Sequence, residues 1–130
     1  MIILSIKTDQ EISEAGLFNR GNKLEYVKWQ AHRELSSTIH KKIEGILKSQ
    51  NISWNNIQGV VFFEGPGSFT GLRIGASVAN ALASDLDIPI VQTAGSKWIE
   101  NGIKQLANNP ENRLAVPKYG SSIHITKPRK

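Results

Sequence analysis

The spacing of apolar residues changes once along the chain, near residue 31, and this change constrains the fold more than any other feature. Before it, short apolar runs at 2–6, 12–18 and 24–29 have the length of β-strands. The polar stretch 19–22 contains Asn and Gly, which tolerate positive φ, and this predicts a hairpin between the second and third runs. The chain therefore opens with three strands, which we expect to form an antiparallel meander.

After residue 31, helices and strands alternate. Apolar residues recur at helical spacing between 32 and 49, which predicts an amphipathic helix. We expect further helices at 69–86 and 96–107, and further strands at 57–63, at 88–91 and, as a short addition, at 114–116. The resulting order, β-β-β-α-β-α-β-α, predicts an α/β fold in which helices pack on a mixed sheet.

The composition excludes several classes of protein. The 130 residues suit one domain, and the absence of cysteine excludes a disulfide framework, a cysteine zinc site and a thiol nucleophile. No apolar run approaches the roughly 20 residues of a membrane span, and nothing at the N-terminus resembles a signal peptide, so we expect a cytoplasmic protein without membrane association. The net charge of +5 favours anionic partners such as RNA, although a solvated basic surface gives the same balance.

The most unusual segment is 65–75, which reads Gly-Pro-Gly-Ser-Phe-Thr-Gly-Leu-Arg-Ile-Gly. It lies between an expected strand and an expected helix, where backbone N–H groups can bind an anion. A standard phosphate loop would continue with Gly-Lys-Ser/Thr, and a dinucleotide site would have an acidic residue about 20 positions further on. The segment has neither feature, so it indicates a phosphate site only weakly.

A ridge of small residues follows the same helix at four-residue spacing: Gly71, Gly75, Ala79 and Ala83. Beside it we expect a stripe of larger apolar residues to face the sheet: Ile74, Val78, Leu82 and Leu86. Each helical glycine costs about 1 kcal/mol relative to alanine, so the two glycines call for the close approach of another backbone. The spacing leaves open whether that backbone belongs to a partner or to the chain's own first helix.

Candidates for catalysis are few. The three histidines, His32, His40 and His124, are scattered along the chain, and Ser68 does not lie in a Gly-x-Ser-x-Gly elbow. Glu64 is a single carboxylate before the glycine-rich turn, where it either points into a cleft or hydrogen-bonds the turn. We therefore predict no catalytic residue, no metal site and no cofactor.

Segment 65–75 closely resembles the signature of the TsaB (YeaZ) family, which belongs to the actin-like ATPase superfamily. The three-stranded opening, the helix that carries His32-Arg33-Glu34 and the ending 117–128 also resemble that family. The resemblance implies an α/β, ribonuclease-H-like single lobe over residues 1–116, followed by a basic C-terminal tail over residues 117–130.

The resemblance also implies a function. TsaB-type proteins form a heterodimer with TsaD, the catalytic subunit, which acts with TsaE to transfer threonylcarbamoyl to an adenosine beside the anticodon of tRNA. This chain would then be a non-catalytic scaffold that pairs with a TsaD-type subunit through the helices at 32–49 and 69–86. The expected interface residues are Phe69, Gly71, Leu72, Arg73, Gly75, Ala79 and Ala83.

Two departures from the family and three alternatives complete the prediction. Lys7 follows the first strand, where the superfamily usually has an Asp that organises metal and phosphate, and 107–114 is too short to hold a second lobe.

One alternative is a nucleotide- or phosphate-binding hydrolase that uses the loop 65–71. Another is a homodimer through the same helices. The third is a tRNA-binding module whose contacts lie in the tail, at Lys127, Arg129 and Lys130.

Overall fold

The sheet is mixed, as the sequence predicts. The computed structural model describes residues 1–118, and in it five strands pair in the order β3-β2-β1-β4-β5. Antiparallel pairing joins β1 to β2 and β2 to β3, whereas β4 pairs in parallel with both β1 and β5. The strands are β1 (Ile2–Lys7), β2 (Ile12–Asn19), β3 (Asn22–Gln30), β4 (Gly59–Phe63) and β5 (Ile90–Thr93).

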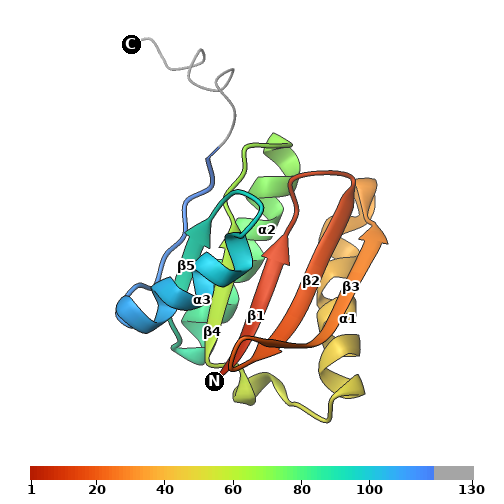
Figure 1. Ribbon diagram of the computed structural model, residues 1–130. Helices are drawn as coiled ribbons and strands as arrows, with labels where there is room; N and C mark the ends of the chain where they lie inside the picture. The colour runs from red at the N-terminus through yellow and green to blue at the C-terminus, as the bar shows by residue number, and fades with distance from the viewer. Residues whose placement is uncertain (119–130) are drawn as a thin grey trace, which may run out of the picture.

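Three α-helices cover the two faces of the sheet unequally (Figure 1). Helices α1 (Leu35–Ser49) and α2 (Phe69–Leu86) lie on one face, and α3 (Trp98–Asn108) lies on the other. The 3-10 helices η1 (His32–Glu34) and η2 (Trp54–Asn56) precede α1 and β4. The element order therefore confirms the predicted β-β-β-α-β-α-β-α arrangement, and α2 has the predicted bounds.

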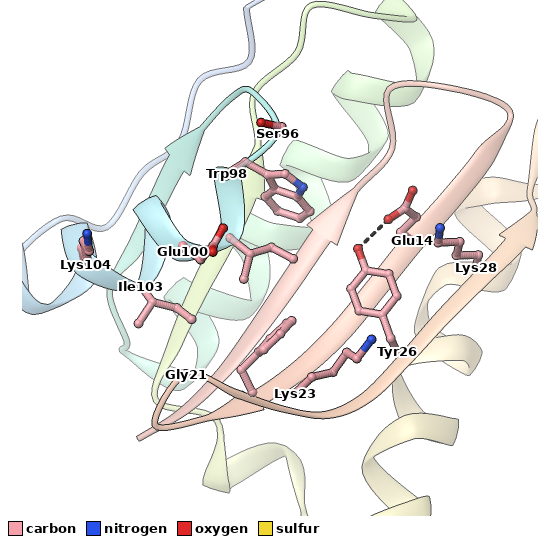
Figure 2. Close-up of a pocket in the computed structure, with 12 residues that line it drawn as sticks. Glu14, Gly21, Lys23, Tyr26, Lys28, Ser96, Trp98, Glu100, Ile103 and Lys104 are labelled. Atoms are coloured by element: carbon pink, nitrogen blue, oxygen red, sulfur yellow. Dashed lines mark hydrogen bonds between the residues drawn. The ribbon is translucent and has the colours of Figure 1, made fainter.

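Each face of the sheet contributes to its own apolar core. Alternate residues of β1 divide between them, because successive side chains of a strand point to opposite faces. Leu4 and Ile6 pack with α1 and α2, whereas Ile3 packs with Val61 and with Trp98 of α3. The strand β4, which lies between β1 and β5, is buried along its whole length, which explains why its sequence is an unbroken apolar run. Beside α3, the outer face of β2 and β3 is open (Figure 2).

The predicted strand at 114–116 is wrong. Side-chain amides take the place of a neighbouring strand there: the backbone N–H and carbonyl of Ala115 exchange two hydrogen bonds with the Asn80 amide, at 2.8 and 2.9 Å. The backbone N–H of Val116 donates to the Gln92 side chain. Several element starts also differ. The elements β4, β5 and α3 each begin two residues later than the pattern predicts, α1 begins three residues later, after η1, and β3 begins two residues earlier.

Most of the predicted tail, including Lys127, Arg129 and Lys130, lies outside the described residues. Within residues 1–118, every helix is too short or too polar to cross a membrane.

Candidate functional site

The segment 65–75 is fastened to the turn between β1 and β2. Ser68 is the N-cap of α2, and its side-chain oxygen accepts a hydrogen bond from the backbone N–H of Gly71 at 3.2 Å. The backbone N–H of Ser68 donates to the carbonyl oxygen of Asp9 at 2.8 Å, and that of Leu72 donates to the Ser68 carbonyl at 2.9 Å. The backbone N–H groups of Ser68 and Gly71 are therefore used within the chain, and that of Leu72 forms the first regular bond of the helix.

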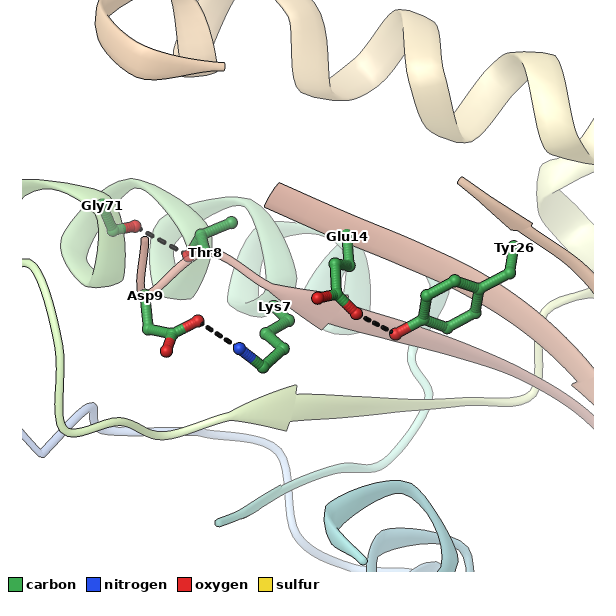
Figure 3. A network of polar contacts seen from close by, with 6 residues as sticks. All are labelled: Lys7, Thr8, Asp9, Glu14, Tyr26 and Gly71. Atoms are coloured by element: carbon green, nitrogen blue, oxygen red, sulfur yellow. Dashed lines mark hydrogen bonds and ion pairs between the residues drawn. The ribbon is translucent and has the colours of Figure 1, made fainter. Parts of the chain in front are cut away.

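Thr8 explains the two glycines in the first turns of α2. Its hydroxyl donates to the Gly71 carbonyl oxygen at 2.8 Å (Figure 3), and the residue is fully buried. A Cβ atom on Gly71 would collide with the Thr8 carbonyl oxygen. One on Gly75 would collide with the Thr8 side chain and lie 3.1 Å from the Phe62 ring. The close approach that the glycines permit is to the chain's own β1–β2 turn.

The small-residue ridge therefore faces inward, and the predicted orientation of α2 is wrong. Ala79 and Ala83 have no exposed surface, and neither does Leu72. Gly75 is buried and Gly71 half-buried against Thr8, so in this structure none of these five residues is on the outer face predicted for it. The larger stripe, predicted to face the sheet, instead lies half-buried at the flanks of the helix: Ile74, Val78, Leu82 and Leu86.

Two residues predicted for the interface do lie on the outside. Phe69 keeps 44% of its surface exposed, and the guanidinium of Arg73 lies over its ring, 5.5 Å from the centroid. Next to them a groove of about 360 Å³ separates α1 from α2. Its lining comes from α1 at Ser36 and from α2 at Thr70, Arg73, Ile74, Ser77 and Val78. Sequence analysis missed Ser36, Thr70 and Ser77, because small polar residues on a helix carry no signal in the apolar pattern.

Lys7 is paired with a carboxylate two residues further along. Its ammonium nitrogen lies 2.7 Å from Asp9 Oδ1 (Figure 3). The same nitrogen lies 4.5 Å from the centroid of the Phe63 ring. Asp9 is buried, and the Lys7 ammonium balances its charge there. A divalent cation at Asp9 would have to displace the lysine or lie beside a like charge, and Mg²⁺ prefers an all-oxygen site. Within residues 1–118, no three His, Asp or Glu side chains gather in a metal-binding group. The donor set does not fit a metal.

Glu64 hydrogen-bonds its surroundings instead of pairing with a second carboxylate. It accepts a hydrogen bond from the Gln92 amide at 3.0 Å and lies 3.6 Å from the Lys118 ammonium. The backbones of Lys118 and Glu64 are also joined, by a hydrogen bond of 2.7 Å. Glu64 thus ties the end of β4 to β5 and to the chain that follows α3. These partners lie outside the glycine-rich turn that was expected to hydrogen-bond it, and Glu64 also lines a pocket of about 530 Å³ with Gln92 and Lys118.

The comparisons with known proteins agree with the resemblance. The family model described as "TsaD: tRNA N6-adenosine threonylcarbamoyltransferase" matches residues 29–112. The tRNA threonylcarbamoyladenosine biosynthesis protein TsaB of Haemophilus influenzae is 33% identical over 91 residues, which are 70% of this chain and 38% of that protein. The TsaB protein of Escherichia coli is 32% identical over 113 residues, 78% of this chain and 46% of that protein. The chain thus spans less than half the length of these relatives.

Two solved structures confirm the ribonuclease-H-like fold. YeaZ from Pseudomonas aeruginosa superposes with a TM-score of 0.67 at 24% identity, over 72% of this chain and 43% of that one. RuvC from Thermus thermophilus superposes with a TM-score of 0.52 at 10% identity, over 93% of this chain and 86% of that one. The signature, the sheet order and the matched residues lead to one assignment: this chain belongs to the tRNA N6-adenosine threonylcarbamoyltransferase (TsaD) family, and within it resembles TsaB (YeaZ).

Proposed function

We propose that the chain pairs with a TsaD-type subunit and takes part in the biosynthesis of tRNA threonylcarbamoyladenosine without supplying a catalytic group. The names of the TsaB relatives support the process. The outer side of α1 and α2 supports the pairing, since it combines an exposed aromatic residue with a groove between two helices. This outer side, and not the glycine ridge, is the surface that we assign to the partner.

The observation that carries the proposal is the character of the groove between α1 and α2. Its apolar floor comes from Ile74 and Val78, while Ser36, Thr70 and Ser77 have short side chains. The distance between two packed helices depends on the side chains at their contact, so short side chains allow a close approach. Phe69 and Arg73 lie beside the groove, and aromatic and Arg residues are enriched among those that carry binding energy.

The interior of the chain supports a role without chemistry of its own. The backbone N–H groups of Ser68 and Gly71 already donate to Asp9 and Ser68, and the Asp9 carboxylate pairs with Lys7. A phosphate or nucleotide at the 65–71 loop would compete with these contacts. The hydrolase alternative would gain support from saturable, Mg²⁺-dependent ATP binding by the isolated chain. TsaE and tRNA enter the proposal as members of the larger assembly.

The pairing is tested by mixing the chain with the TsaD-type subunit of the same genome and measuring the mass of the eluted species by light scattering. The informative variant is Ser77→Trp, because Ser77 is exposed and lines the groove. Its matched control is Asn101→Trp, since Asn101 is an exposed polar residue of α3 on the opposite face of the sheet. Far-UV circular dichroism verifies that both variants are folded.

We expect a heterodimer with the wild type and with Asn101→Trp, and separate subunits with Ser77→Trp. No complex with the wild type, even with TsaE, ATP and tRNA added, would refute the pairing. A complex that Ser77→Trp leaves intact would refute the assigned surface. A wild-type chain that elutes alone with twice its mass, and loses this state in Ser77→Trp, would favour the homodimer alternative instead.

A further inference from the structure

The two faces of the sheet differ in how many helices cover them. Neighbouring strands lie about 4.8 Å apart and a helix with its side chains is about 10 Å wide, so one helix covers about two strands. Helices α1 and α2 cover one face, whereas α3 packs mainly on β4 and β5 of the other. The outer face of β2 and β3 is left without a helix (Figure 1). The space beside α3 has the width of one more helix.

That space is a groove with an apolar floor. Its volume is about 670 Å³, and it runs between α3 and the outer face of β2 and β3 (Figure 2). Phe18 and Tyr26 form the floor and meet edge to face, with ring centroids 6.3 Å apart. From α3, Ile99 and Ile103 form an apolar wall four residues apart, and both remain half-buried. A row of apolar side chains at this spacing is the side that one helix offers to another.

The floor is held in a fixed position. The Tyr26 hydroxyl donates to a Glu14 carboxylate oxygen at 2.5 Å, and its ring lies over Gly16, where a Cβ would approach the ring to 2.5 Å. Burial, followed by the hydrogen bond and the charge of Glu14, raises the pKa of Tyr26 well above its ordinary value, so the phenol stays protonated and keeps donating. A preformed surface loses little conformational freedom when it binds a partner.

The rim of the groove is basic. Lys23 and Lys28 stand on β3, and Lys104 stands on α3, all exposed. Glu100 is the one exposed carboxylate in the lining, because Glu14 is half-buried and bonded to Tyr26. A second copy of this chain complements the rim poorly, since its net charge is +5. The surface calls for an acidic partner.

We propose that this groove binds an amphipathic helix of a separate, acidic protein. The apolar side of that helix would lie on Phe18, Tyr26 and Ile103, and acidic residues at its flanks would face the three lysines. This is the helix-in-groove mode of recognition, in which residues at i, i+3, i+4 and i+7 fill an apolar channel. The groove lies on the opposite face of the sheet from the α1–α2 surface, so the inference does not depend on the proposed function.

The probes are two synthetic helical peptides of about 18 residues, long enough for five turns. Both carry the same stripe of Leu; one has Glu at its flanks and the other has Lys. Each is labelled with fluorescein and titrated with the full chain while anisotropy is measured, at low and at high salt. We expect saturable binding of the Glu peptide that weakens with salt, and binding of the Lys peptide that is weaker by about tenfold or more.

Charge reversal at the rim provides the specific test. The double variant Lys23→Glu/Lys28→Glu should reverse the order of the two affinities, so that the Lys peptide binds better than the Glu peptide. The matched control is Lys41→Glu/Lys48→Glu, which changes the net charge equally on the exposed side of α1. Thermal melts verify that both variants are folded. Three results would overturn the proposal. The wild type could bind neither peptide saturably, or it could bind both with equal affinity. The third result is a loss of affinity for the Glu peptide in the α1 control as large as the loss in the rim variant.

Discussion

The inner and outer sides of α2 carry side chains of different size: the buried positions are apolar and mostly small, whereas Phe69, a large apolar residue, is exposed. The inner side has the smallest residues, at Gly71, Gly75, Ala79 and Ala83, and contacts Thr8 and the sheet. The outer side has Phe69, the largest exposed apolar residue of the helix, with Arg73 over its ring. At Gly71 and Gly75 the close approach of Thr8 requires a residue without a side chain, while Leu72 and Ala76 complete the apolar inner side.

This contrast separates two roles that one segment combines. Residues that face Thr8 are required for the fold of the isolated chain, whereas residues that face outward are available to a partner. Substitutions on the inner side should therefore change the free energy of unfolding. Those on the outer side should change the affinity for a partner and leave the free energy of unfolding nearly unchanged.

The largest effect is expected at Leu72, the one large side chain on the inner side. Leu72→Ala removes a fully buried side chain from the core and should lower the free energy of unfolding by about 2–5 kcal/mol. Urea unfolding followed by circular dichroism measures this value. Leu114→Ala is the control, since Leu114 is 64% exposed, and a comparable loss there would contradict the division into inner and outer residues.

Gly75→Ala should destabilise the chain although alanine is the better helix former. The added methyl group would collide with the Thr8 side chain and press on Phe62. Such overpacking costs about 1–3 kcal/mol, which exceeds or offsets the gain of about 1 kcal/mol in helix propensity. Chemical unfolding gives the net value. An increase in stability would mean that α2 lies further from the β1–β2 turn than the structure has it.

Removal of the helix cap tests the start of α2. Ser68→Ala deletes the oxygen that accepts from the Gly71 N–H and should cost about 1 kcal/mol. Ser84→Ala is the natural comparison, because Ser84 is an exposed serine inside the same helix and caps nothing in the described chain. Differential scanning calorimetry of the two variants distinguishes them. Equal melting temperatures would show that the cap contributes nothing to stability.

An exposed glycine should respond in the opposite sense to Gly75. Gly45 lies inside α1, and a Cβ atom there would meet nothing within 4 Å. Gly45→Ala should therefore raise the free energy of unfolding by about 0.5–1 kcal/mol, through the lower entropy of the unfolded chain and the better helix propensity. The sign is the test: the same substitution should stabilise at residue 45 and destabilise at residue 75.

The smallest change in stability is expected on the outer side. Ser77→Glu places a charge at an exposed position of α2 and should alter the free energy of unfolding by no more than about 0.5 kcal/mol. The same charge would lie in the groove next to α1, where the proposed partner packs, so the affinity for a TsaD-type subunit should fall sharply. Isothermal titration of the subunits, together with urea unfolding of the variant, separates the two effects.

The sequence predicted the architecture well and the orientation of α2 poorly. Local patterns are sufficient for the strands and helices, because the period of the apolar residues reports the conformation of a segment directly. The face of α2 depends on Thr8, which is 63 positions away from Gly71 and carries no local signal. The two glycines did predict a close approach, and only its partner was unknown. The pairing of Lys7 with Asp9 was likewise invisible, since it depends on how the chain turns after β1.

The contacts between Ser68, Gly71 and the Thr8–Asp9 turn also give a reason, independent of any partner, for a related chain to keep these residues. A side chain at Gly71 or Gly75 would collide with Thr8 whether or not a partner is bound. Selection for a folded chain is therefore enough to retain Gly71 and Gly75, whatever the chain binds. A change of partner would instead be expected to alter exposed positions of the α1–α2 groove outside the motif, such as 36 and 77, where substitutions should cost little stability.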